Sequence, residues 1–205
     1  MKKLKIFLLI NLLVFFSISV AFAGTSTPIV EPNRVGETYD LDVPLYQQVN
    51  KYYCGPVCVR MILKHFGMSV TEKEAAKLCN AKSPGGSYLK DLTAALNEKL
   101  KKTAYYSKGT WNTSFIDNTI ASIKANYPVI CGVIPRYLPN YPDTNTSDGH
   151  FVVVDGYSIQ AGAKTTIILR YNDPHYDDRY FGSYSVEYSQ MEDAINAHWS
   201  YYSSH

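Results

Sequence analysis

The chain has 205 residues, 46% of them hydrophobic, and its 20 basic and 18 acidic residues leave a formal net charge of +2. This near balance argues against a nucleic-acid partner, which would need a concentrated basic surface. The length suits one domain with its own hydrophobic core and is short for two.

The first 23 residues have the pattern of a secretory signal peptide. Lysines at positions 2, 3 and 5 precede an apolar run over residues 6–20, and Ala21-Phe22-Ala23 is a typical cleavage signature. We therefore expect cleavage after Ala23 and a secreted protein with no membrane association once the signal is removed. An uncleaved membrane anchor is the alternative, but the apolar run is short for a spanning helix.

Residues 24–40 are rich in Thr, Ser, Pro and Asn and show no hydrophobic periodicity. This composition predicts a flexible lead-in to one domain over residues 41–205. The alternation of apolar and polar residues over Leu41–Leu45 then predicts a short edge strand, a position that tolerates Pro44.

The stretch from Gln48 to Pro56 is followed at once by an apolar-periodic run, Val57–Phe66. Pro56 fits the first turn of a helix, so Cys54 is expected at or just before a helix N-terminus. Unpaired N–H groups and the positive end of the helix dipole favour the thiolate, which is the nucleophilic form of cysteine. The side-chain amide of Gln48 could donate a hydrogen bond to an oxyanion formed there.

The middle of the chain predicts mainly helices. Thr71–Glu74 has the sequence of a capping box that opens a helix ending near Leu78. Apolar residues at helical spacing predict further helices over about 87–101 and 114–125, and strands are expected over about 103–107 and 127–134.

His150 opens an apolar run over residues 150–157 that predicts a buried strand, and a second strand-like run covers 165–171. If the two pair as an antiparallel hairpin, the start of the first lies beside the end of the second. Asp173 would then lie near His150, which supplies a base and an orienting carboxylate for a thiol nucleophile. His175 competes with His150 for the role of base.

The remaining segments complete the fold prediction. The long loop 135–149 is a candidate cleft wall or lid. A last strand is expected over 184–188, and Ser189–Glu192 has the sequence of a second capping box, opening a helix to about residue 198. Helices first and strands second predict an α+β domain in which a helical lobe packs against an antiparallel sheet.

Four cysteines in an exported protein raise the question of disulfides. Cys58 lies one helical turn after Cys54, which is poor geometry for a bridge, and is expected to be buried in the core. A bridge between Cys79 and Cys131 is possible and is not decided by spacing. No Cys or His spacing fits a zinc site, so we expect neither a metal nor a cofactor.

Three motifs together resemble a known family: Gln48 with Cys54-Gly55-Pro56, the run Gly149–Tyr157, and Asn172-Asp173-Pro174. They are similar to the C39 and C39-like papain-fold cysteine peptidases, over about residues 42–193. The best-known members trim double-glycine leader peptides from bacteriocins and peptide pheromones. The resemblance implies a papain-like fold with Cys54 as nucleophile, His150 as base, Asp173 as orienter and Gln48 as oxyanion donor. Those members are usually domains of membrane transporters, whereas this chain follows an export signal, so the double-glycine substrate is not carried over.

The expected function is therefore a secreted, monomeric cysteine peptidase that hydrolyses a peptide or protein substrate through a Cys-His-Asp triad. Two alternatives stay open. One is an acyltransferase that uses the same thioester chemistry, and the other is a non-catalytic exported module that binds peptides or confers immunity.

Overall fold

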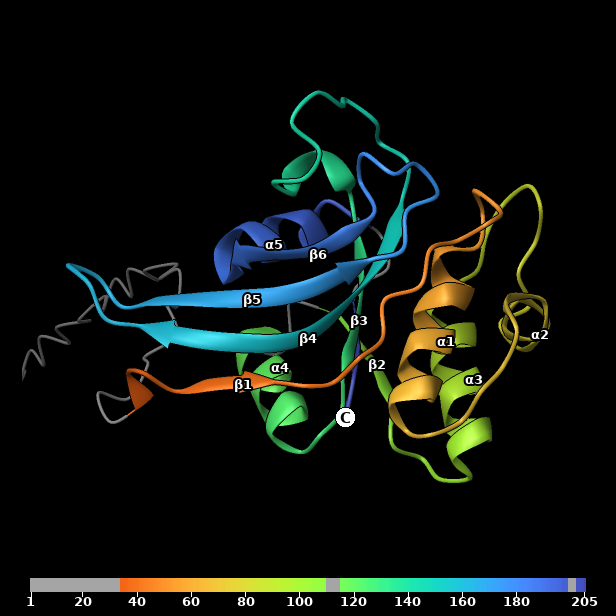
Figure 1. Cartoon of the computed structure of the whole chain (residues 1–205), viewed down its shortest axis with the longest axis horizontal. Helices are drawn as coiled ribbons and strands as arrows, with labels where there is room; N and C mark the ends of the chain where they lie inside the picture. The colour runs from red at the N-terminus through yellow and green to blue at the C-terminus, as the bar shows by residue number, and fades with distance from the viewer. Residues whose placement is uncertain (1–33, 110–114, 199–201) are drawn as a thin grey trace, which may run out of the picture.

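The computed structural model describes residues 34–109, 115–198 and 202–205, so the predicted signal peptide lies outside the described residues. Helices α1 to α3 form a group at one end of a seven-stranded antiparallel sheet (Figure 1). This arrangement confirms the predicted α+β class, with a helical lobe against an antiparallel sheet. Within the described ranges, no helix has both the length and the apolar character needed to cross a membrane.

The elements alternate irregularly along the chain. The helices are α1 (Cys54–His65), α2 (Glu72–Leu78), α3 (Leu89–Leu100), α4 (Phe115–Lys124) and α5 (Tyr188–Asn196), with a 3-10 turn η2 at Pro135–Tyr137. The strands are β1 (Thr38–Asp40), β2 (Tyr106–Lys108), β3 (Val129–Val133), β4 (His150–Gln160), β5 (Thr166–Asp173), β6 (Gly182–Glu187) and β7 (Tyr202–Ser204). The sheet has the order β2-β7-β3-β4-β5-β6, and β1 also pairs with β4.

Helix α1 begins at Cys54, as the sequence predicts. Its N-cap, Tyr53, makes no side-chain capping bond, and Pro56 lies in the first turn, where its missing N–H removes no helix bond. The helix stops before Gly67, which has φ of 79° in the left-handed region favoured by glycine after a helix. The buried face of α1 packs against β4 and α3.

One predicted capping box is confirmed and the other is wrong. At α2, the Thr71 hydroxyl accepts from the Glu74 N–H at 3.2 Å, and the Glu74 carboxylate accepts from the Thr71 N–H at 2.7 Å. Helix α5 starts at Tyr188 and not after Ser189, and its N-cap, Glu187, makes no side-chain capping bond. The reason is that β6 stays paired with β5 through Glu187, so the helix begins directly where that strand ends.

The edge strand predicted over Leu41–Leu45 is also wrong, because the strand is β1, which pairs with residues 156–158 of β4. Strand β3 pairs with the same edge of β4 up to Val154, so β1 can pair with β4 only beyond that residue. A glycine at 156 permits the approach, since a Cβ there would lie 2.8 Å from the Tyr39 carbonyl oxygen. Residues 41–48, which we call the strap, continue without strand pairing from β1 to the turn before α1.

Part of the predicted lead-in belongs to the folded unit. Besides β1, Glu37 accepts a bond of 2.7 Å from Lys124 on α4 and one of 2.8 Å from the hydroxyl of Tyr157. Residues 34–40 are therefore attached to the sheet and to α4.

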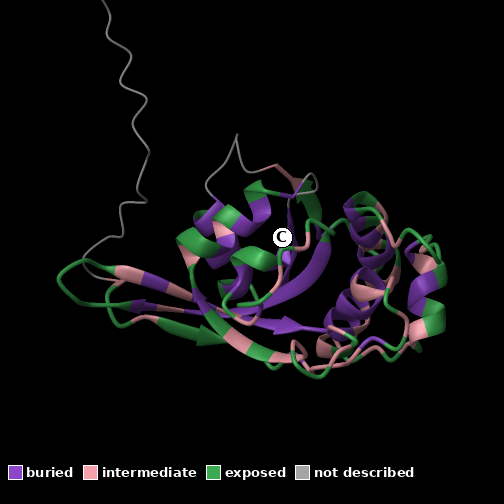
Figure 2. Ribbon diagram, turned by 90° about the horizontal axis from the view of Figure 1, so that it is seen from above, coloured by how far each residue is buried: buried purple, intermediate pink, exposed green. Residues whose placement is uncertain are grey.

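Strand β4 contributes residues to two hydrophobic cores, one on each face of the sheet. Val152 and Val154 lie in the core with α4 and α5, whereas Phe151 and Val153 lie in the core with α1 to α3. A β-bulge at Asp155 shifts the alternation, so that Tyr157 and Ile159 remain in the first core. Figure 2 shows the buried residues along the middle strands and the exposed tip of the β4–β5 hairpin.

Strand β7 was not predicted from the sequence. It is buried between β2 and β3, pairing with both.

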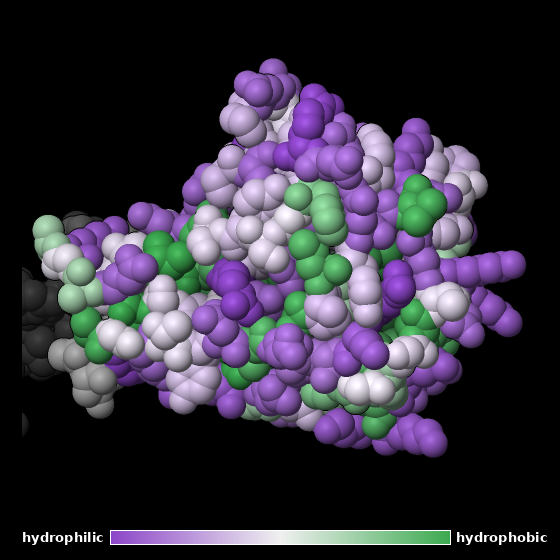
Figure 3. Space-filling model, viewed as in Figure 1, coloured by the Kyte–Doolittle hydropathy of each residue, from purple (hydrophilic) through white to green (hydrophobic). Residues whose placement is uncertain are grey.

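The face of the molecule in Figure 3 is largely hydrophilic, with hydrophobic residues in small separate groups.

Candidate active site

The thiol of Cys54 lies at the first residue of α1, where the backbone N–H groups have no acceptor within the helix. A tight turn leads into the helix, because the Tyr53 N–H donates to the Asn50 carbonyl at 2.9 Å. The Cys54 side chain is partly exposed and makes no disulfide.

The other three cysteines are buried free thiols, so the possible Cys79–Cys131 bridge is not formed. Burial raises the pKa of Cys58 and Cys131 far above the ordinary range, and raises that of Cys79 to about 12. Cys58 is buried in the core, as predicted, and its thiol donates to the Phe151 carbonyl. Cys54 is thus the one thiol of the four with access to solvent.

His150 and Asp173 meet through the pairing of β4 with β5, which is antiparallel as predicted. His150 is the first residue of β4, and Asp173 is the last residue of β5. The ring Nε2 of His150 lies 2.7 Å from Oδ1 of Asp173, and both side chains are buried.

The charges of this pair are coupled. Burial lowers the pKa of His150, but the charge of Asp173 and hydrogen bonds with Asp173 and Cys54 outweigh it and raise this pKa to about 10. Burial likewise opposes ionisation of Asp173, yet the charge of His150 and its hydrogen bonds hold the pKa of Asp173 below the ordinary value. The pair therefore favours an imidazolium beside a carboxylate. Because Nε2 contacts Asp173, Nδ1 is the ring nitrogen left for Cys54.

Gln48 ends the strap and is 3% exposed. Its backbone N–H donates to the Pro174 carbonyl at 2.8 Å, and its side-chain Nε2 donates to the Asn50 carbonyl at 3.0 Å. One hydrogen of the amide nitrogen is thereby used, and a second remains for another acceptor. Oε1 of Gln48 is buried without a hydrogen-bond partner among the described residues.

Residues 40–204 match the sequence model of the Peptidase_C39 like family. The chain belongs to this family. The match covers all four predicted site residues and begins at the last residue of β1. No match was found among proteins of curated function.

Solved structures place the chain in the same fold as C39-like and papain-like proteins. A chain from Bacillus anthracis described as a C39-like peptidase aligns with a TM-score of 0.58 at 19% identity, over 82% of this chain and 98% of that one. Bromelain from Ananas comosus, solved with the inhibitor E64, gives 0.54 at 12% identity, over 83% and 98%. The peptidase domain of Streptococcus ComA, a bifunctional ABC transporter, gives 0.50 at 16% identity, over 80% and 95%. At these identities the likeness concerns the fold.

In this member of the C39-like family, sequence reasoning missed two residues that hold Asp173. Its Oδ2 accepts from the Tyr141 hydroxyl at 2.8 Å and from Asn140 Nδ2 at 3.1 Å. Both donors come from the loop 135–149. Its unusual length was the only signal in the sequence, and it indicated a cleft wall or lid without indicating these residues.

His175 does not take the place of His150. Its backbone N–H donates to Asp173 Oδ1 at 3.0 Å, while its ring Nδ1 accepts from the Asp177 N–H at 3.0 Å. Burial and the nearby charge of His150 lower the pKa of His175. His150 is thus the ring paired with the carboxylate, and the His175 ring lies beside it, with a distance of 5.6 Å between the ring centroids.

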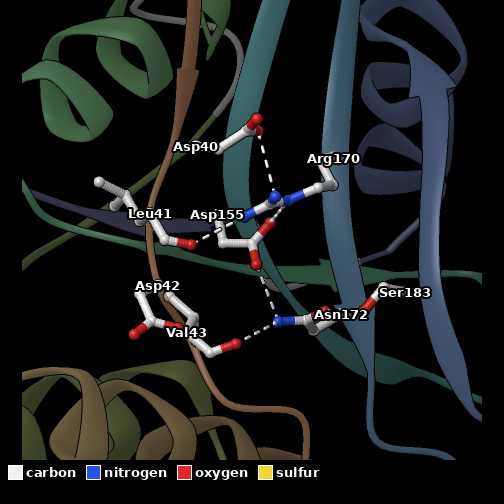
Figure 4. Close-up of a pocket in the computed structure, with 8 residues that line it drawn as sticks. All are labelled: Asp40, Leu41, Asp42, Val43, Asp155, Arg170, Asn172 and Ser183. Carbon is white, nitrogen blue, oxygen red and sulfur yellow. Dashed lines mark hydrogen bonds and ion pairs between the residues drawn. The ribbon is translucent and has the colours of Figure 1, made fainter.

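A second polar cluster fastens the strap to the sheet (Figure 4). The carboxylate of Asp155 accepts from Arg170 Nε at 2.8 Å and from Asn172 Nδ2 at 2.9 Å. The same two side chains donate to strap carbonyls, Arg170 to Leu41 at 2.7 Å and Asn172 to Val43 at 3.2 Å. The adjoining pocket of about 400 Å³ is lined by Asp40, Leu41, Asp42, Val43, Asp155, Arg170, Asn172 and Ser183.

Among residues 34–109, 115–198 and 202–205, no group of three His, Cys, Asp or Glu side chains is placed to hold a metal ion.

Proposed function

We propose that the protein is a cysteine peptidase in which Cys54, His150 and Asp173 form the catalytic triad and Gln48 donates to the oxyanion. The observation that carries the proposal is the buried pair of His150 Nε2 and Asp173 Oδ1 at 2.7 Å, beside a partly exposed Cys54 thiol that helps to raise the pKa of His150. Membership of the C39-like family and the papain-like fold support the same reaction class.

The reaction follows from the charges of these groups. The Cys54 thiolate attacks a peptide carbonyl carbon, and the carbonyl π electrons move to oxygen, where Gln48 and a backbone N–H at the start of α1 stabilise them. As the C–N bond breaks, Nδ1 of His150 gives its proton to the leaving amine. His150 then takes a proton from water, the water oxygen bonds to the thioester carbon, and the C–S bond breaks, which releases the acid and restores the Cys54 thiolate beside the His150 imidazolium. Asp173 keeps the imidazole oriented throughout.

The test compares Cys54→Ala with Cys58→Ala, which removes a thiol one helical turn away. One sample of each native protein is treated with iodoacetamide and analysed for labels, and a second, unlabelled sample is incubated with a mixture of peptides, whose new termini are counted by mass spectrometry. We expect one label and turnover in the wild type and in Cys58→Ala, and neither in Cys54→Ala, with turnover lowered at least ~10⁴-fold. Turnover that survives in Cys54→Ala would remove the triad.

Two further outcomes separate the alternatives. A product that carries an added amine in place of water would indicate acyl transfer. A reversible peptide complex, with no cleavage and no alkylation at pH 7, would indicate a binding module.

We also propose that the protein is exported and acts as a monomer on peptide or protein substrates. The lysines, apolar run and small residues of positions 1–23 support export. Mass spectrometry of the secreted form tests it, because cleavage after Ala23 would leave Gly24 as the first residue.

A further inference from the structure

The turn between the strap and α1 is built around the backbone of Asn50. The Asn50 carbonyl accepts from the Gln48 side-chain amide at 3.0 Å and from the Tyr53 N–H at 2.9 Å. The Asn50 side chain accepts from the Tyr52 N–H at 2.9 Å. The position of Asn50 therefore sets both the direction of the Gln48 amide and the entry into the helix that carries Cys54.

Glu72, the first residue of α2, holds this turn from a different element. Its carboxylate accepts from the Val49 N–H at 3.1 and 3.2 Å and from the Asn50 N–H at 3.3 Å. Hydrogen bonds to a carboxylate are stronger than those between neutral groups. Two consecutive N–H groups of the turn are thereby tied to α2, which itself packs against α1.

Apolar packing does not fix the turn at this point. Val49 is 89% exposed, so its side chain packs against little of the protein, and its backbone N–H holds it in place through Glu72. Nor is Glu72 needed to cap its own helix, because Thr71 and Glu74 form the capping box of α2. The bonds of Glu72 thus serve the turn that follows Gln48.

We propose that Glu72 is a positioning residue for oxyanion stabilisation. It fixes Val49 and Asn50, the Asn50 carbonyl fixes the Gln48 amide, and the amide keeps its second N–H directed toward the oxyanion. This inference rests on the proposed peptidase function. Glu72 is expected to affect kcat more than KM, because an oxyanion forms only as the carbonyl is attacked.

A double-mutant cycle with Gln48 tests the route of action. Glu72→Ala is expected to lower kcat about tenfold, a fraction of the ~10²–10³-fold that loss of an oxyanion donor typically costs. Glu72→Gln, which keeps one acceptor oxygen, should fall between the wild type and Glu72→Ala. In a Gln48→Ala background, Glu72→Ala should cause less than a twofold further loss.

Glu74→Ala is the matched control. It removes the capping box of the same helix, and so lowers stability, while leaving the bonds from Glu72 to the turn in place. Its effect on kcat should be the same with Gln48 or Ala at position 48. Hydrogen exchange measured by NMR gives a readout without turnover: the Val49 and Asn50 amides should lose protection in Glu72→Ala and keep it in Glu74→Ala.

Full activity in Glu72→Ala, or a tenfold loss that persists in the Gln48→Ala background, would overturn the role of Glu72. Failure of the peptidase proposal gives a different result, because the wild type itself would then neither cleave peptides nor react with iodoacetamide.

Discussion

Tyr141, in the long loop before β4, donates a hydrogen bond of 2.8 Å to Asp173 at the end of β5. The carboxylate of Asp173 thereby accepts from four donors, since Asn140, the His175 N–H and the His150 ring also contact it. Such a shell keeps a fully buried carboxylate ionised against the cost of desolvation. Asp173 can then hold His150 in one orientation.

Tyr141→Phe removes one of these donors while it preserves the aromatic ring. We expect kcat to fall about tenfold, which corresponds to about 1.4 kcal/mol and is close to the lower end of the roughly 1.5–3 kcal/mol of a hydrogen bond to a charged group. Kinetics on a cleaved peptide measure this loss. Tyr137→Phe is the control and should match the wild type, because the Tyr137 hydroxyl, in the same loop, contacts Arg136 and is not among the donors to Asp173.

The His150–Asp173 pair predicts a loss of stability at alkaline pH. The pKa of His150 is raised from 6.5 to about 10 in the folded protein. A group with a raised folded pKa stabilises the protein fully below its unfolded value, and this contribution is lost as pH rises through the folded value. The free energy of unfolding should therefore decline between about pH 6.5 and 10 in the wild type. Urea unfolding of His150→Gln should lack this decline, and parallel curves would contradict the prediction.

Asp155 predicts a pH dependence on the acid side. Burial raises the pKa of Asp155 from 3.8 to about 6, and the ion pair with Arg170 only partly offsets this. The folded state thus binds this proton more tightly, so the contribution of Asp155 to stability declines as pH rises from about 4 to 6. The unfolding free energy of the wild type minus that of Asp155→Asn should fall over this range. A difference independent of pH would show that the carboxyl is ionised throughout.

Gly149 predicts a steric requirement beside His150. A Cβ at this position would clash with Nε2 of His198, so Gly149→Ala forces either the start of β4 or the His198 ring to move. Overpacking of this kind costs about 1–3 kcal/mol, and displacement of His150 should also lower kcat. Thermal unfolding and kinetics measure the two effects. In a His198→Ala background the added methyl group has room, so Gly149→Ala should cost much less there; an undiminished cost would exclude this clash.

Much of the fold could be predicted because its signals are local. Pro56 and Gly67 bracket α1, and Thr71 with Glu74 caps α2, so these helices follow from neighbouring residues. The approach of His150 to Asp173 followed from one assumption about pairing, since the ends of an antiparallel hairpin must adjoin.

The rest depends on contacts between distant segments. Strand β1 pairs with residues 156–158 of β4 because the pairing of β3 with β4 ends at Val154. No pattern within residues 34–45 indicates where that pairing ends. Ser189 and Glu192 have the spacing of a capping box, but the pairing of β6 with β5 decides where α5 starts. Tyr141, Asn140 and Glu72 act through hydrogen bonds across the fold, which sequence spacing does not reveal.

Strand β7 has a consequence for the order of folding. In the described sheet, β2 is bonded only to β7, and β7 is bonded in turn to β3. The sheet thus acquires the strand that follows α3 only after residues 202–204 have been synthesised. Until then β2 has no strand partner, whereas α1 can already pack against β4, so we expect β2 to be among the last elements of the domain to be fixed during synthesis.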